Sequence, residues 1–146
     1  MTDIGEIRNK VQRILTSNFS VRLDNEGDFI VDYESANCWV EVRDLELFDK
    51  KVGQISFVCP MVRDVRLTPE VFKWVALEGH DFRFGSAVCY EDDNGSTGSL
   101  FFEYSMIGVD VDESEVVNAV MFLLLVCSDL DTELQQKFGG RLFGED

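Results

Sequence analysis

The sequence predicts an α+β protein in which helices pack on an antiparallel sheet. Apolar residues recur at helical spacing in three separate segments, and they alternate with a period of two in the segments between. The predicted order is a helix, three or four strands, a helix, a two-stranded hairpin and a last helix, which is typical of one sheet covered by helices. At 146 residues, the chain fits a single domain over residues 1–146.

The first helix is predicted over residues 3–17. Asp3, with Glu6 three residues later, is typical of a helix N-terminus. The apolar positions that indicate the helix are Ile4, Ile7, Val11, Ile14 and Leu15.

Residues 19–63 are predicted to form three or four strands, separated by the turn DNEGD and by further polar residues. In the run 38–42 the even-numbered residues are apolar and share one face, whereas Trp39 and Glu41 lie on the other. Pro60 lacks a backbone N–H, so it indicates an edge or a bulge in the last of these strands.

A second helix is predicted to start at Thr68, which suits the N-cap, with Pro69 in the first turn. Gly79 is expected to end it, and Trp74 lies off its expected buried stripe. That stripe consists of Val71, Phe72, Val75 and Ala76. Two strands, 82–91 and 99–107, follow as a hairpin joined by the loop DDNGSTG.

The last helix is expected to open at Asp112, with Glu115 completing a capping pattern, and a break near Ser128 is one alternative for its course. Its predicted buried stripe is Val116, Val120, Leu123, Cys127, Leu130 and Leu134. Gly139 is expected to end it in a left-handed conformation, so Leu142 and Phe143 can fold back against Phe138 or the sheet. A phosphate cradle is excluded, because it would use the N-terminal end of a helix.

The chain is acidic, with 28 Asp and Glu against 13 Lys and Arg and a net charge of −15. Much of this excess lies in residues 91–146, which hold 13 acidic residues against two basic ones, or −11. Such a field repels phosphate backbones and anionic membranes, so we expect no nucleic-acid and no membrane partner. It favours partners with basic groups, although solubility alone is an alternative explanation.

The cysteines and the apolar segments indicate a cytoplasmic protein. The N-terminus has no hydrophobic signal core, and the longest apolar stretch, VVNAVMFLLLVC, is too short and interrupted to span a membrane. Scattered cysteines in apolar runs predict buried free thiols, not a disulfide framework. They are Cys38, Cys59, Cys89 and Cys127.

No catalytic, metal-binding or cofactor-binding constellation stands out. The single histidine, His80, follows a helix end, and cysteines at least 21 positions apart cannot form the paired ligands of a zinc site. In the loop after residue 91, Thr97 stands where a calcium loop requires glycine, and strands flank the segment. Both glycine-rich nucleotide motifs are absent. The prediction is therefore a protein that is not an enzyme and has no metal or cofactor.

Apolar surface offers the remaining indication of function. Phe101 lies opposite Leu100 and Phe102, and Trp39 lies opposite Cys38 and Val40. These two strands are therefore apolar on both faces, and only one face can pack on the helices. The other face requires a second layer, a homodimer or a partner segment in a groove. The candidate partner-binding residues are Trp39, Trp74 and Phe101.

The element order, the size and the acidity resemble the class I type III secretion chaperone and YbjN-like superfamily, in particular the actinobacterial YbjN-type proteins. The residues that carry the likeness are LEGHDFRFGSAVCYED, LFFEYSMIG, DESEVVNAV and DTELQQKFGGRLF. The resemblance implies a secretion-chaperone-like fold and a dimeric, non-enzymatic protein that holds an extended or partly unfolded segment of another polypeptide. This sequence departs from the pattern in residues 19–63, where three strands are usual and four are possible.

The leading hypothesis is therefore a homodimeric, chaperone-like protein with a polypeptide client bound on apolar surface rimmed by acidic groups. The alternative is a small-molecule or lipid-binding α+β domain with an aromatic-lined pocket. An enzyme with carboxylates that carry no recognisable signature is a third hypothesis.

Overall fold

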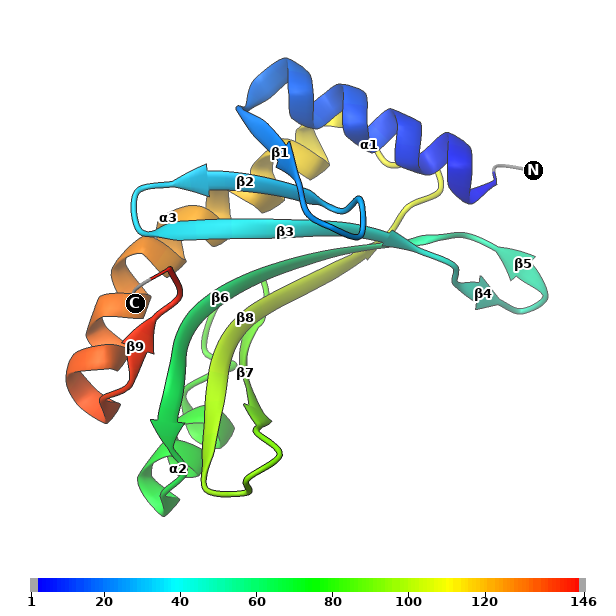
Figure 1. Ribbon diagram of the computed structural model, residues 1–146. Helices are drawn as coiled ribbons and strands as arrows, with labels where there is room; N and C mark the ends of the chain where they lie inside the picture. The colour runs from blue at the N-terminus through cyan, green and yellow to red at the C-terminus, as the bar shows by residue number, and fades with distance from the viewer. Residues whose placement is uncertain (1–2, 145–146) are drawn as a thin grey trace.

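The computed structural model describes residues 3–144 and has a seven-stranded antiparallel sheet with helices on one face (Figure 1). The strands follow the spatial order β1-β2-β3-β6-β8-β7, and β9 pairs with β6. Their bounds are β1 Val21–Leu23, β2 Phe29–Tyr33, β3 Ala36–Arg43, β6 Gln54–Arg66, β7 Ser86–Glu91, β8 Thr97–Ile107 and β9 Arg141–Leu142. This arrangement confirms the predicted α+β class.

Residues 19–66 contribute four strands to this sheet, which settles the predicted choice between three and four. Three short strands are present that the sequence does not predict. Two of them, β4 (Glu46–Leu47) and β5 (Lys50–Lys51), form a separate hairpin that projects at the right of Figure 1. The third is β9, after the last helix. Each of the three is only two residues long, too short for a period-two pattern to show.

The three helices begin as their capping residues predict. In α1 (Ile4–Asn18), the side chain of Asp3 accepts a hydrogen bond from the Glu6 N–H at 2.8 Å. In α2 (Pro69–Leu77), Thr68 occupies the N-cap and Pro69 the first turn. In α3 (Glu113–Phe138), the Asp112 carboxylate accepts from the Glu115 N–H at 2.9 Å. Each side chain satisfies one of the backbone donors left open at a helix start.

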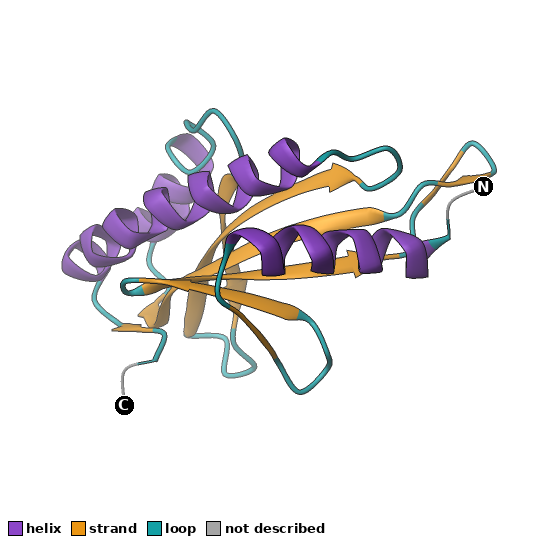
Figure 2. Ribbon diagram, turned by 90° about the horizontal axis from the view of Figure 1, so that it is seen from above, coloured by secondary structure: helices purple, strands orange, loops and turns teal. Residues whose placement is uncertain are grey.

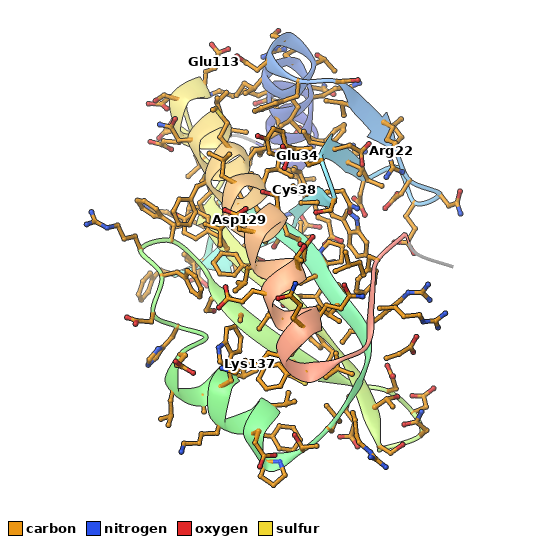
Figure 3. The ribbon with its side chains drawn as sticks, turned by 90° about the vertical axis from the view of Figure 1, so that its left-hand side faces the viewer. Arg22, Glu34, Cys38, Glu113, Asp129 and Lys137 are labelled. Carbon is orange, nitrogen blue, oxygen red and sulfur yellow. The ribbon has the colours of Figure 1, made fainter. Side chains whose placement is uncertain are left out.

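The long helix α3 crosses the strands and supplies much of the core (Figure 3). Its predicted stripe is buried along its full length: Val116, Val120, Leu123, Cys127, Leu130 and Leu134. The stripe packs on β6, β3, β2 and β8, and α1 packs against α3 and β3. In Figure 2 both long helices lie over the strands. One layer of helices thus covers one face of the sheet.

The structure decides one open alternative for the helices and corrects one expectation. α3 runs without a break through Ser128, whose hydroxyl donates to the Leu125 carbonyl at 3.1 Å and so finds a partner within the helix. In α2 the buried residues are Val71 and Trp74, whereas Phe72 is 51% exposed and Ala76 is exposed. A helix this short packs on the core through one side only, and in α2 that side carries Trp74.

The central strands β6 and β8 bend strongly, and the inner side of the bend, at the lower right of Figure 1, faces away from α1 and α3. Their register shifts between Pro60 and Val62 and again between Val62 and Val65, so of the two features that Pro60 indicates, an edge or a bulge, the structure has the bulge. A bulge inserts an extra residue into one strand and increases its local bend. The bulge next to Pro60 therefore adds to the bend of β6.

The α3 stripe gives the first testable prediction. Leu123 is fully buried, whereas Leu77, the last residue of α2, is 61% exposed. We expect Leu123→Ala to lower the free energy of unfolding by about 2–5 kcal/mol, because it removes buried methyl groups and leaves a cavity. The matched variant Leu77→Ala should change it by less than about 0.5 kcal/mol. Urea unfolding followed by circular dichroism measures both, and equal effects would contradict this packing.

Candidate functional site

The face of the sheet opposite α3, here called the open face, is formed by alternate residues of every long strand. Residues directly opposite one another on neighbouring strands share a face. One such row crosses six strands, from β1 to β7, and consists of Arg22, Ile30, Trp39, Val58, Glu103 and Ser86. The next row holds Glu41, Ser56 and Ser105. Apolar and acidic side chains thus stand side by side on this face.

Four aromatic rings gather on the open face, here called the aromatic cluster: Trp39, Tyr90, Phe101 and Phe143. The ring centroids of Trp39 and Phe101 lie 6.0 Å apart in an edge-to-face arrangement, and those of Tyr90 and Phe101 lie 5.4 Å apart. Phe143 completes the cluster at 5.3 Å from Phe101 and 6.5 Å from Trp39. These spacings are those of favourable aromatic pairs.

The structure therefore brings together two of the three predicted partner-binding residues. Trp39 lies on β3 and Phe101 on β8, separated by β6, so their meeting depends on the strand order. Both are partly exposed, whereas their neighbours Cys38, Val40, Leu100 and Phe102 are fully buried on the helix side. The expectation that these two strands carry apolar residues on both faces is confirmed.

Trp74 does not join this cluster. Its side chain is 8% exposed and belongs to the core, and its ring lies 6.2 Å from that of Phe138 at the end of α3. The expectation that Trp74 lies off the buried stripe of its helix is wrong. The structure therefore removes the reason for placing Trp74 at an interface.

A cleft of about 330 Å³ opens beside the aromatic cluster. Its aromatic walls are Trp39, Tyr90 and Phe101, and its polar residues include Glu41, Arg43 and Glu103. Arg43 donates from Nε to Glu41 Oε2 at 2.8 Å. The cleft can therefore contact an apolar group with its rings and a cation with its carboxylates.

Glu103 lies at the centre of this face and accepts a hydrogen bond from the Tyr90 hydroxyl. This hydrogen bond, together with partial burial and the charge of the carboxylate, raises the pKa of Tyr90 to about 12. The phenol therefore stays protonated and keeps Glu103 oriented across the cleft at neutral pH.

A second hollow, of about 420 Å³, lies on the other side of the sheet between β8 and α3. The ring of Phe84 lies 6.0 Å from that of Tyr104 and 5.4 Å from that of Phe122. Glu115 and Asn118 provide polar groups at this hollow. It is the aromatic-lined space that the alternative hypothesis requires.

The residues weighed for metal or catalytic roles have other partners or lie apart. In the loop between β7 and β8, Asn94 accepts from the backbone of Ser96 and Thr97, and Thr97 donates to Asp92 at 2.6 Å. His80 is exposed after α2. Within residues 3–144, no group of three or more His, Cys, Asp or Glu side chains could hold a metal ion.

The fold and this site together define a class: a helix-backed antiparallel sheet whose opposite face carries an aromatic and acidic cleft. The chain belongs to the family TY-Chap1, described as T3SS (YopN, CesT) and YbjN peptide-binding chaperone 1, whose family model matches residues 5–146. The family is thus a peptide-binding chaperone family, and the resemblance noted in the sequence is confirmed.

The solved structures contain a similar fold. YbjN from E. coli, whose proposed role is transcription regulation, matches with a TM-score of 0.58 over 93% of each chain at 12% identity. At that identity the likeness concerns the fold alone. No curated protein matches the chain. No helix within residues 3–144 is long and apolar enough to cross a membrane.

Tyr90, Phe143 and Glu103 belong to the site but are not among the residues predicted from the sequence to bind a partner. Tyr90 follows Val88 at the period-two spacing that places both on one face, so its position could have been found. Glu103 required the same step on β8. Phe143 was expected to pack on Phe138 or the sheet, and the structure selects the sheet.

The link between Tyr90 and Glu103 can be tested by titration. We expect Glu103→Gln to lower the pKa of Tyr90 from about 12 towards the ordinary value of ~10, because the carboxylate that holds the phenol proton is lost. In the native protein this interaction stabilises the fold below pH ~10, and its contribution is lost as the pH rises through about 12. Absorbance at phenolate wavelengths measures the shift, with Glu91→Gln as a neighbouring control. An unchanged titration in Glu103→Gln would contradict the assignment.

Proposed function

We propose that this protein is a non-enzymatic, chaperone-like protein that holds an extended or partly unfolded segment of another polypeptide on its open face. The observation that carries the proposal is the aromatic cluster beside Glu41 and Glu103, on a sheet face turned away from the helices, in a member of a peptide-binding chaperone family.

The chemistry of the cleft favours a polypeptide. An extended segment projects side chains alternately, so every second residue can reach a ring of the aromatic cluster. Aromatic side chains offer large contact area and few rotatable bonds to immobilise. With a net charge of −15, the protein also attracts segments that carry Lys or Arg, which speeds their encounter.

The remaining features of the proposal concern setting and assembly. We propose one domain over residues 1–146 that acts in the cytoplasm without a cofactor and without binding nucleic acid or membrane. Free cysteines support the location: Cys38, Cys59 and Cys127 are buried and Cys89 is partly buried. Burial raises the pKa of the Cys59 thiol, with Cys127 and Cys38 adding to the shift, which keeps this thiol unreactive.

We propose a homodimer formed through the outer side of α3. Tyr33, Met121 and Leu125 are 42%, 47% and 51% exposed beside a hollow of about 290 Å³. A two-fold contact would bury this surface on both copies at once. Light scattering should give twice the chain mass for the wild type, and Leu125→Asp should shift it towards the monomer. A wild type that remains monomeric at high concentration would contradict the proposal.

The central test is peptide binding by single-site variants. We expect Trp39→Ala and Phe101→Ala each to weaken binding to immobilised 12-residue peptides by at least about tenfold, because each removes a ring from the cleft. Phe72→Ala is the matched control, since Phe72 is an aromatic residue 51% exposed on α2, away from the open face.

Two outcomes would contradict this function. Equal binding by all three variants would place the peptide elsewhere. Failure of the wild type to bind any peptide, together with a small ligand that co-purifies and is lost in Phe122→Ala, would favour the alternative of a small-molecule or lipid site. That alternative rests on the 420 Å³ hollow between β8 and α3, whose size is within the usual range for ligand sites.

A further inference from the structure

Residues 141–143, near the end of the described chain, lie beside β6 and reach the open face. Arg141 pairs with Arg63 and Leu142 with Val62. The partners of β3 on β6 are residues 54–58, so β3 and β9 lie one after the other beside β6, on the side away from β8. The tail thus lies in line with β3 along the same side of β6.

Three successive tail residues make three different contacts. Arg141 donates from Nε to Asp64 Oδ2 at 2.9 Å. Leu142 packs against the core, and the ring of Phe143 lies on Phe101 and Trp39. The tail therefore presents a basic, an apolar and an aromatic residue in that order, each to a surface of matching chemistry.

These contacts hold the tail only lightly. Two residues pair with β6, and both side chains of the Arg141–Asp64 ion pair are nearly half exposed, at 47% and 45%, so solvent screens it. Gly139, Gly140 and Gly144, all with positive φ, flank the paired residues. Short strands at a sheet edge are readily exchanged for another extended chain.

The open face also retains an unused acceptor. Asn37 lies two residues before Trp39 on β3 and so on the same face. Among residues 3–144, its Oδ1 has no hydrogen-bond partner although the atom is buried. Buried polar atoms almost always have a hydrogen-bond partner in native proteins, so this acceptor stands out on the open face.

We propose that Arg141–Phe143 occupies the place of a client strand, and that the client is an extended segment in which a basic, an apolar and an aromatic residue follow one another. This inference rests on the proposed function and specifies its ligand. The client displaces the tail, pairs with β6 beside Val62, places its basic group at Asp64 and seats its aromatic ring on Trp39 and Phe101. The tail then competes with the client for this site, so a client must make contacts that match those of the tail.

Two glycines that flank the tail allow a matched test in the full chain. Both have positive φ, 83° at Gly140 and 94° at Gly144, so an alanine at either position is strained in the backbone. A Cβ on Gly140 would lie 2.5 Å from the Arg63 carbonyl oxygen, whereas a Cβ on Gly144 would meet no atom within 4 Å. Gly140→Ala should therefore unseat the tail, and Gly144→Ala, which follows the tail contacts, should leave it in place.

The probe is the fluorescein-labelled peptide GGRLFG, which repeats residues 139–144. We expect Gly140→Ala to bind it at least about tenfold more tightly than the wild type, because the competing tail no longer occupies the site. Gly144→Ala should bind as the wild type does. Peptides with Phe→Ala or Arg→Glu should lose most of the binding to Gly140→Ala. Fluorescence anisotropy measures each affinity, and circular dichroism checks that the variants are folded.

Phe143→Ala provides a second variant should Gly140→Ala fail to fold, since it frees the aromatic cluster and leaves the backbone unchanged. Equal affinity of the probe for the wild type, Gly140→Ala and Phe143→Ala would overturn the inference. If these variants bind no probe while immobilised peptides still bind in a Trp39-dependent way, the inference fails and the proposed function stands. If neither kind of peptide binds, both fail.

Discussion

The contact between α3 and the central strand β6 is the constraint on which the rest of the structure depends. Eight apolar residues of α3 are buried along one side of the sheet, and α1 packs on the same side. The chain has no further long helix within residues 3–144 to cover the opposite face. Each long strand therefore carries two kinds of residue, as β6 does with the buried Phe57 and the partly exposed Val58.

That asymmetry explains why the open face is both aromatic and acidic. A second layer built from this chain would have to bury Glu103, and an unpaired buried carboxylate is costly. Placed at the centre of the row between Val58 and Ser86, Glu103 keeps the face accessible to water or to a partner with basic groups. Trp39 and Phe101 supply the apolar contact, so the face suits a segment that is itself mixed in character. The acidity that repels phosphate backbones is the same property that favours such a segment.

Much of this organisation could be predicted from the sequence, because it depends on local periodicity. The caps at Asp3, Thr68 and Asp112, the stripe of α3 and the two-faced pattern around Trp39 are all local features. Trp74 was misplaced because a nine-residue helix has two apolar edges and tertiary packing chooses between them. The aromatic cluster required the strand order, since Trp39, Phe101 and Phe143 come from three separate strands or loops. Nothing in the pattern of one strand shows which residue of another lies beside it.

The glycine pair after α3 shows how one local feature acquires a role from its surroundings. Gly139 has the positive φ expected at a helix end, but its ψ of −156° places it in an extended region open chiefly to glycine and not in the left-handed helical region. The chain therefore leaves α3 extended rather than coiled back on the helix. Gly140 then passes so close to the Arg63 carbonyl that a side chain would not fit. An extended exit and a close approach are both needed to lay residues 141–142 along β6. The same two glycines leave that short strand attached through flexible backbone, which is the property that an exchangeable strand requires.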